Sequence, residues 1–351
     1  MIIRRLEFLA LATSALLLTF LGWRVEGQTS LHDLPARAVE RSQITLPGGA
    51  PFHLRATVFE GTNRDNDNYN AEIEEDWAAP DKWRRTVKTS KFSETLTLNG
   101  GKVSAQIDGD YYPLWLRTLV DAIFDPGAPL QGVDMTKSSD NPILSLGGET
   151  PTCRRFGYRV GIPPVGNTIF ASYCFQGGLL QSIFKPGYSA EYSKYKKVGE
   201  KQVAHRIQEY IEPGTTLEAD IVDLNEPATL DNSLFNVDQP SGPLQTITLN
   251  EQDFRALALY APDIHQWPTI GDGKPVGTLS IYVCVDRQGT VREIYALNSD
   301  NPYMTDAASK QVMGWKFKPV SNNGEPVQIE SILTFAYQTE IDPKQNRQSS
   351  H

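Results

Sequence analysis

The residue types that usually carry enzyme chemistry are present, but their spacing matches no known catalytic or metal-binding motif. The five histidines are scattered along the chain, and none belongs to a His-x-x-x-His pair or lies near a cysteine at metal-ligand spacing. No Gly-x-Ser-x-Gly elbow and no Gly-x-x-x-x-Gly-Lys-Ser/Thr phosphate loop occurs. The sequence therefore predicts a non-enzymatic protein with no catalytic residue, no metal site and no cofactor.

One short segment, Asp65-Asn-Asp-Asn68, has the alternating oxygen ligands of a calcium-binding loop. It lacks the glycine and the terminal glutamate that complete such a loop. Asn and Asp are also preferred in tight turns. We therefore interpret the segment as the solvated tip of a hairpin.

The overall composition limits the class of protein and of partner. The chain has 351 residues, of which 40% are hydrophobic and 21% charged, and these values favour about two globular domains. Asp and Glu number 42 against 33 Lys and Arg, which gives a net charge of −9. Because this charge repels phosphates, the sequence predicts no nucleic-acid partner.

The first residues have the pattern of an export signal. Arg4 and Arg5 precede an apolar stretch that only Glu7 interrupts, and Val25-Glu-Gly27 has the small residue of a cleavage site. We therefore expect residues 1–27 to be a signal peptide and the chain to be exported to the periplasm. The alternative is an uncleaved inner-membrane anchor formed by residues 6–23, since a bilayer core needs about 20 apolar residues.

Export makes a disulfide bond between Cys153 and Cys174 feasible. The two cysteines flank alternating stretches at 155–162 and 167–173, which the turn signal Pro163-Pro-Val-Gly166 joins. Pairing them would stabilise the fold by about 3 kcal/mol in the chain-entropy model. The alternative is two buried thiols. Cys284 lies in a strand pattern and is expected to be a small buried hydrophobic residue.

The elements that position these residues are mostly short strands. Between residues 31 and 222, apolar and polar side chains alternate in short runs separated by turn signals such as Asn99-Gly-Gly101. Only residues 113–124 repeat apolar side chains at helical spacing, with Pro113 at the start, where its missing N–H is not needed. This part is predicted to be one large antiparallel sheet with one covering helix.

Several motifs in this part resemble the lipoprotein-carrier (LolA/LolB-like) group over residues 45–238. They are Pro51-Phe-His-Leu-Arg-Ala, Trp77-Ala-Ala-Pro-Asp-Lys-Trp-Arg-Arg85, Asp108-Gly-Asp-Tyr-Tyr-Pro113 and Val198-Gly-Glu-Lys-Gln-Val203. The resemblance implies a strongly curved sheet, a half-barrel, whose covering helix leaves a groove for a lipid acyl chain. The alternative is a dry core. The residues expected to line the groove are Trp77, Trp83, Phe92, Ile107, Trp115 and Phe124.

The C-terminal part has a different pattern, and residues 239–246 form a polar, proline-containing linker to it. Asn250 is a candidate helix cap. Two alternating strands at 277–286 and 290–298 follow, then a helical spacing of apolar residues from Met304 to Trp315, and a last strand at 327–337. The predicted order is strand, strand, helix, strand.

Four motifs in this part, in the same order and spacing, resemble the C-terminal domain of the TonB family over residues 247–340. They are Gly277-Thr-Leu-Ser-Ile-Tyr-Val-Cys-Val-Asp-Arg-Gln-Gly-Thr-Val291, Asp306-Ala-Ala308, Gly314-Trp-Lys-Phe-Lys-Pro319 and Asn323-Gly-Glu-Pro-Val327. The chain differs from the family's transducers in three ways. Gln266-Trp-Pro-Thr-Ile270 replaces the usual Tyr-Pro segment, a folded domain replaces the proline-rich spacer, and the N-terminal apolar run has no histidine.

This resemblance implies partner binding rather than catalysis. In the family, the C-terminal domain binds an outer-membrane transporter by adding the transporter's N-terminal segment to a sheet edge through backbone hydrogen bonds. We therefore expect a TonB-like protein in transmembrane transport, with an outer-membrane or other envelope protein as partner. The alternative is a periplasmic lipid or lipoprotein carrier acting through the N-terminal domain. The expected edge residues are Gln328, Glu330, Ile332, Thr334 and Ala336.

Together these patterns predict an α+β protein with two folded domains. Residues 28–238 form the large curved sheet with its helix, residues 247–340 form the small C-terminal domain, and residues 341–351 form a polar tail. If the linker is a true boundary, residues 244–345 should fold alone.

Overall fold

The structure is a computed structural model, and it describes residues 34–45, 49–61, 68–126, 152–160, 167–185, 188–212, 215–227, 229–237, 241–264, 267–270 and 274–341. Three predicted features lie outside the described residues. They are the expected signal peptide or anchor, residues 65–67 of the expected hairpin tip Asp65–Asn68, and most of the polar tail. Across the described part of the chain, no helix is long and apolar enough to span a membrane.

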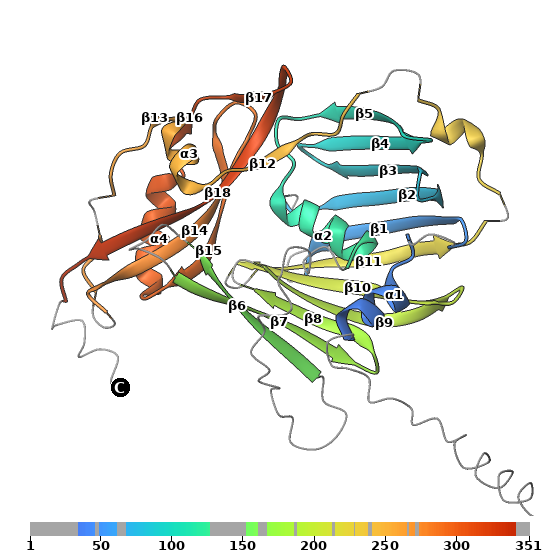
Figure 1. Ribbon diagram of the computed structural model, residues 1–351, viewed down its shortest axis with the longest axis horizontal. Coiled ribbons are helices and arrows are strands. Elements are labelled where there is room, and N and C mark those ends of the chain that lie inside the picture. The colour runs from blue at the N-terminus through green and yellow to red at the C-terminus, as the bar shows by residue number, and fades with distance from the viewer. Residues whose placement is uncertain are drawn as a thin grey trace, which may run out of the picture.

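An open antiparallel sheet of eleven strands forms the N-terminal domain (Figure 1). Its spatial order is β5-β4-β3-β2-β1-β11-β10-β9-β8-β7-β6, so chain neighbours pair almost throughout and β11 returns to pair with β1. The strands are β1 (Phe52–Glu60), β2 (Ala71–Ala79), β3 (Lys82–Thr89), β4 (Ser93–Asn99), β5 (Lys102–Asp108), β6 (Thr152–Val160), β7 (Asn167–Gln176), β8 (Leu179–Lys185), β9 (Tyr188–Val198), β10 (Lys201–Glu212) and β11 (Thr215–Asn225).

Helix α2 (Leu114–Phe124) covers one face of this sheet, as the sequence predicts (Figure 1). Pro113 is the N-cap of the helix. Leu116 and Leu119, on the apolar side of the helix, are completely buried. The alternating pattern of β1 sends Leu54 and Ala56 into the same core, while Arg55 between them is exposed. A short helix, α1 (Leu34–Ser42), packs against β8 and β10.

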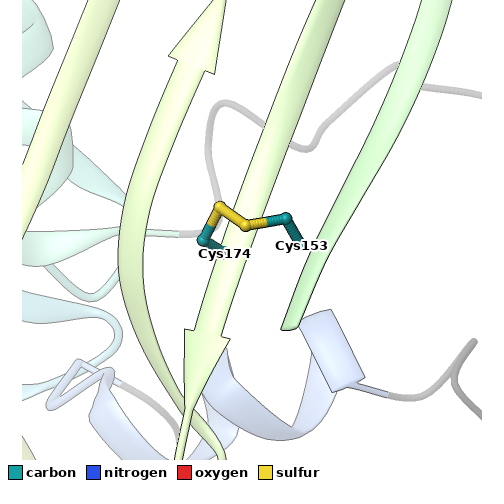
Figure 2. The surroundings of a disulfide bond; sticks show 2 residues. All are labelled: Cys153 and Cys174. Carbon is teal, nitrogen blue, oxygen red and sulfur yellow. A yellow bond between two sulfur atoms is a disulfide. The ribbon is translucent and has the colours of Figure 1, made fainter. Parts of the chain in front are cut away.

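Strands β6 and β7 form a hairpin at one end of the sheet, and a disulfide bond joins them (Figure 2). Cys153 lies directly opposite Cys174 in the register, and their Cα atoms are 4.0 Å apart. Cys284 is a free, fully buried cysteine in the other domain.

A second sheet, with strand order β12-β18-β14-β15, forms the C-terminal domain. Helices α3 and α4 accompany it, and Asn250 caps α3 through its side chain, as predicted. The elements are β12 (Thr246–Thr248), α3 (Glu251–Ala256), β13 (Ala258–Tyr260), β14 (Val276–Val285), β15 (Val291–Ser299), α4 (Pro302–Val312), β16 (Lys316–Phe317), β17 (Val320–Asn322) and β18 (Glu325–Gln338); a 3-10 turn, η4 (Asn232–Phe235), precedes them. The predicted α+β class, with a large curved sheet and a smaller strand and helix domain, is confirmed.

The turn between β14 and β15 explains one of the sequence motifs. The buried Asp286 carboxylate accepts hydrogen bonds from the N–H groups of Gln288 and Thr290 and pairs with Arg292 at 2.6 Å. Gly289 has a φ of +80°, and a Cβ atom there would lie 1.9 Å from the carbonyl oxygen of Phe317. Only glycine therefore fits this turn.

The C-terminal sheet buries both of its faces. On one face, Leu279, Ile281 and Val283 pack with Met304 of α4 and Trp315 in the domain's own core. The other face carries alternating polar residues, and it lies against the N-terminal domain. Cys284 and Tyr295 from this face are buried in the same cluster as the N-terminal core.

The connection between the domains is fixed along the outer edge of β5. Ser241 donates its hydroxyl to the carbonyl oxygen of Ala105 and accepts the N–H of the same residue, at 2.9 and 2.8 Å. Its own N–H bonds the carbonyl oxygen of Val103 at 3.0 Å. Leu244 then donates its N–H to the Glu94 carboxylate.

Candidate functional site

The expected partner-binding strand is β18, and it is an inner strand along part of its length. One side pairs with β14 from Val276 to Val285. Alternate residues of a strand turn their backbone groups to the same side, and the bonds of Gln328, Glu330 and Thr334 place the even-numbered residues on the side away from β14. The five predicted edge residues therefore share one edge, which we call the β18 edge (Gln328, Glu330, Ile332, Thr334 and Ala336).

The first part of the β18 edge is occupied by the chain itself. Strand β12 pairs in parallel with residues 328–330. The N–H of Gln328 bonds the carbonyl oxygen of Gln245 at 3.1 Å, and the N–H of Leu249 bonds that of Glu330 at 2.8 Å. Strand β17 covers residues 325–327 in an antiparallel hairpin.

Helix α3 occupies the middle of the β18 edge with side chains rather than with backbone. The buried carboxylate of Glu251 accepts the N–H of Thr334 at 3.1 Å. Arg255 contacts the carbonyl oxygen of Thr334 at 3.4 Å and pairs with Glu251 at 2.7 Å. Within the described part of the chain, the N–H groups of Ile332 and Ala336 meet no hydrogen-bonding partner, and the carbonyl oxygen of Ile332 lies 3.5 Å from the hydroxyl of its neighbour Ser331.

The six residues expected to line a groove belong to one apolar cluster with α2. Trp77, Phe92, Trp115 and Phe124 are each at most 4% exposed, whereas Trp83 and Ile107 are partly buried. Trp77 stacks on Phe52 with ring centroids 5.4 Å apart. The structure therefore brings these side chains together, with Trp115 and Phe124 contributed by α2 itself.

Charged side chains lie within this apolar cluster. Arg85 pairs with the buried Glu75, and its guanidinium lies 4.0 Å from the ring centre of Phe124 on α2. Burial raises the pKa of the Glu75 carboxyl, and the positive charge of Arg85 opposes this shift. Burial also raises the pKa of Glu94. Buried charges are expected to be paired, as Glu75 is with Arg85 here.

Sequence reasoning missed a buried polar network between the two domains. The Glu330 carboxylate of β18 pairs with Arg117 of α2 and accepts the hydroxyl of Tyr282 at 2.5 Å. The Glu293 carboxylate of β15 accepts the hydroxyl of Tyr111 and, at 2.7 Å, the N–H of Leu114 in the first turn of α2. A carboxylate at a helix N-terminus is favoured by the helix dipole.

Further contacts of this network hold the segment that leads into α2. The side-chain amide of Gln328 pairs with both backbone groups of Tyr112, at 3.0 and 3.3 Å. Arg287 donates to the carbonyl oxygen of Gly109 at 2.6 Å. Burial raises the pKa of Glu293, and it raises that of Tyr282 to about 12. The sequence signal for this network is only the polar alternation of β14 and β18, which is equally typical of a solvated face.

One group of described residues could hold a metal ion. It lies on the face of the N-terminal sheet away from α2. Ligand atoms of His53, Glu74 and Asp76 all lie within 4.8 Å of one another. His53 already bonds Asp76 through Nδ1 at 2.9 Å. The register also places Arg55 opposite Glu74 and Arg84 opposite Asp76, and such cations offset the carboxylate charges. We interpret the group as a hydrogen-bonded surface cluster.

A hollow of about 650 Å³, lined mostly by charged residues, lies beside α1. Its lining includes Arg41, which bonds the carbonyl oxygen of Gly177, and Lys201, which bonds that of Glu40. These cations are therefore bound to the chain's own backbone. The hollow does not include any of the residues expected to line the groove.

The comparisons with known proteins agree with the C-terminal resemblance. The profile of the family described as Gram-negative bacterial TonB protein C-terminal matches residues 274–339, which contain β14, β15, α4 and β18. The predicted resemblance to this domain is thereby confirmed. No curated protein matches the chain.

Solved structures match the N-terminal part weakly. A LolA superfamily protein from Nitrosomonas europaea is 8% identical, with a TM-score of 0.29, and the match covers 59% of this chain and 97% of that one. A DUF1329 family protein from Desulfovibrio piger is also 8% identical, with a TM-score of 0.31, and the match covers 58% and 95%.

Proposed function

We propose that this chain is a non-enzymatic periplasmic protein that binds an envelope partner by strand addition at the β18 edge. The observation that carries the proposal is the combination of the TonB C-terminal match over residues 274–339 with a row of outward backbone groups on β18. A partner strand that pairs there needs mainly backbone hydrogen bonds, so the role requires few special side chains along the edge.

The test uses peptides that represent the N-terminal segments of outer-membrane transporters. Binding of an array of such peptides to the full chain would be compared with binding to the Ile332→Pro and Ala336→Pro variants. Proline removes an outward N–H without breaking the ladder to β14, so both variants should lose binding.

Ala336→Ser is the matched control, because it changes the same exposed side chain but keeps the N–H; it should bind like the unchanged chain. Peptides that bind all three variants equally would contradict strand addition at this edge.

A second candidate function is carriage of a lipid or lipoprotein acyl chain under α2. The packing of Trp115 and Phe124 of α2 in one apolar cluster with Trp77, Trp83, Phe92 and Ile107 of the sheet domain favours it. The discriminating measurement is mass spectrometry of solvent extracts from the purified chain. A stoichiometric lipid would support a carrier, and a lipid-free extract from chain purified without detergent would count against it.

A further inference from the structure

Residues 245–255 occupy the β18 edge, where the proposed partner strand would pair. Backbone groups of Gln245 and Leu249 take two of its hydrogen bonds, and the side chains of Glu251 and Arg255 take both backbone groups of Thr334. A partner that adds a strand to this edge must therefore replace part of this segment. This inference rests on the proposed function.

The same segment indicates which peptide chemistry the edge accepts. Its sequence from 245 to 249 is Gln-Thr-Ile-Thr-Leu. The apolar side chains of Ile247 and Leu249 pack against the core of the C-terminal domain, whereas Thr248 is exposed. Since side chains alternate along a strand, the edge fits an extended segment with aliphatic residues at every second position.

The pairing geometry adds a direction. Strand β12 runs parallel to β18, with Thr246 opposite Gln328 and Thr248 opposite Glu330. The side-chain amide of Asn322 also bonds that of Gln245 at 2.7 Å, which fixes where the segment begins. A competing strand that uses the same backbone groups would run in this direction and register.

We propose that the β18 edge is a self-occupied docking site for an extended peptide that alternates polar and aliphatic residues and pairs in parallel with residues 328–330. Residues 245–255 compete with such a peptide. Its apparent affinity for the unchanged chain is the intrinsic affinity multiplied by the fraction of molecules in which the segment has left the edge.

The experiment uses a fluorescein-labelled peptide that carries Gln-Thr-Ile-Thr-Leu, with fluorescence anisotropy as the readout. Leu249→Pro removes the N–H that bonds Glu330, and Glu251→Ala removes the acceptor of the Thr334 N–H. Each variant of the full chain should bind the peptide about three- to tenfold more tightly than the unchanged chain, because a competing hydrogen bond is lost.

Two controls define the result. Gln252→Ala changes an exposed residue of α3 that does not face the edge, and it should bind like the unchanged chain. The peptide Gln-Thr-Thr-Ile-Leu has the same composition, but its two aliphatic residues are adjacent, so only one of them can face the core in any register; it should bind no variant. Circular dichroism would establish that each variant is folded.

Equal binding to the unchanged chain and to both edge variants would overturn the proposal, as would equal binding of the peptide without alternation or no binding to any folded variant. The probe comes from the chain itself, so its result does not depend on a transporter peptide being found. If the probe behaves as expected and no transporter peptide binds, the self-occupied edge stands and the proposed envelope function fails.

Discussion

Arg117 of α2 and Glu330 of β18 form an ion pair that joins the covering helix of one domain to an inner strand of the other. Glu330 is 3% exposed, and the carbonyl oxygen of the same residue accepts the N–H of Leu249 from the segment that occupies the β18 edge. Glu330 therefore contacts both the segment that occupies the edge and the helix that covers the N-terminal core.

We expect Arg117→Ala to destabilise the chain by about 3–5 kcal/mol, because the buried Glu330 carboxylate would lose its cation. Replacing both partners, with Arg117→Met and Glu330→Leu, should recover most of this loss. Urea unfolding of the full chain measures both. Lys274→Ala, which breaks an exposed pair with Asp300, is the control and should cost far less, because water screens this pair. A double variant as unstable as Arg117→Ala would contradict this account of the pair.

Glu293 should make stability fall as the pH rises. Burial raises its pKa above the usual value of 4.5, so the folded chain retains this proton to higher pH than the unfolded chain does. The free energy of unfolding of the unchanged chain, relative to Glu293→Gln, should therefore decrease from about pH 4.5 through the raised pKa.

Asp300 provides a control of opposite sign. Hydrogen bonds from Lys274 and Thr278 lower its pKa below 3.8, so its contribution is present above that pH and is lost as the pH falls. The unchanged chain should gain stability relative to Asp300→Asn as the pH rises. Urea titrations at several pH values measure both differences, and equal slopes for the two variants would refute the assignment of Glu293.

The free thiol of Cys284 can report whether the domains separate. The C-terminal core around Leu279 and Trp315 lies within residues 244–345, so we propose that this fragment folds alone. The face that carries Cys284 would then lose its cover from the N-terminal domain. Cys284 should react with a thiol reagent far faster in the fragment than in the folded full chain. A fragment with the circular dichroism spectrum of an unfolded chain would mean that the halves share one core.

The disulfide bond gives a separate prediction. Denatured, unreduced chain should show one free thiol among its three cysteines. The double variant Cys153→Ser with Cys174→Ser should lose about 3 kcal/mol, because the unfolded chain regains the entropy of an open loop. Three free thiols in the unreduced chain would rule out the bond.

Local signals explain why several elements could be predicted from the sequence. Pro113 and the apolar spacing that follows it define α2, and Asn250 with Asp253 defines the start of α3. The turn residues Asn323 and Gly324 both have positive φ, which is the conformation of a tight hairpin between β17 and β18. Each of these signals acts over a few residues.

The inter-domain network could not be predicted in the same way. Glu330 and Arg117 are 213 residues apart in the chain, and alternation along β18 shows only that one side of the strand is polar. It does not show whether water or another domain covers that side. The pairing of β12 with β18 could not be predicted for the same reason. Local patterns do not show which strand the connection between the domains reaches.

The bonds of Ser241 to Val103 and Ala105 also affect how separate copies of the chain meet. Strand β5 ends the eleven-stranded sheet, and a bare end strand is a template on which a second molecule can pair and aggregate. Because the residues that cover β5 follow it by more than a hundred positions, this template stays open until the later part of the chain has been made. A chain truncated before residue 241 would keep it open permanently.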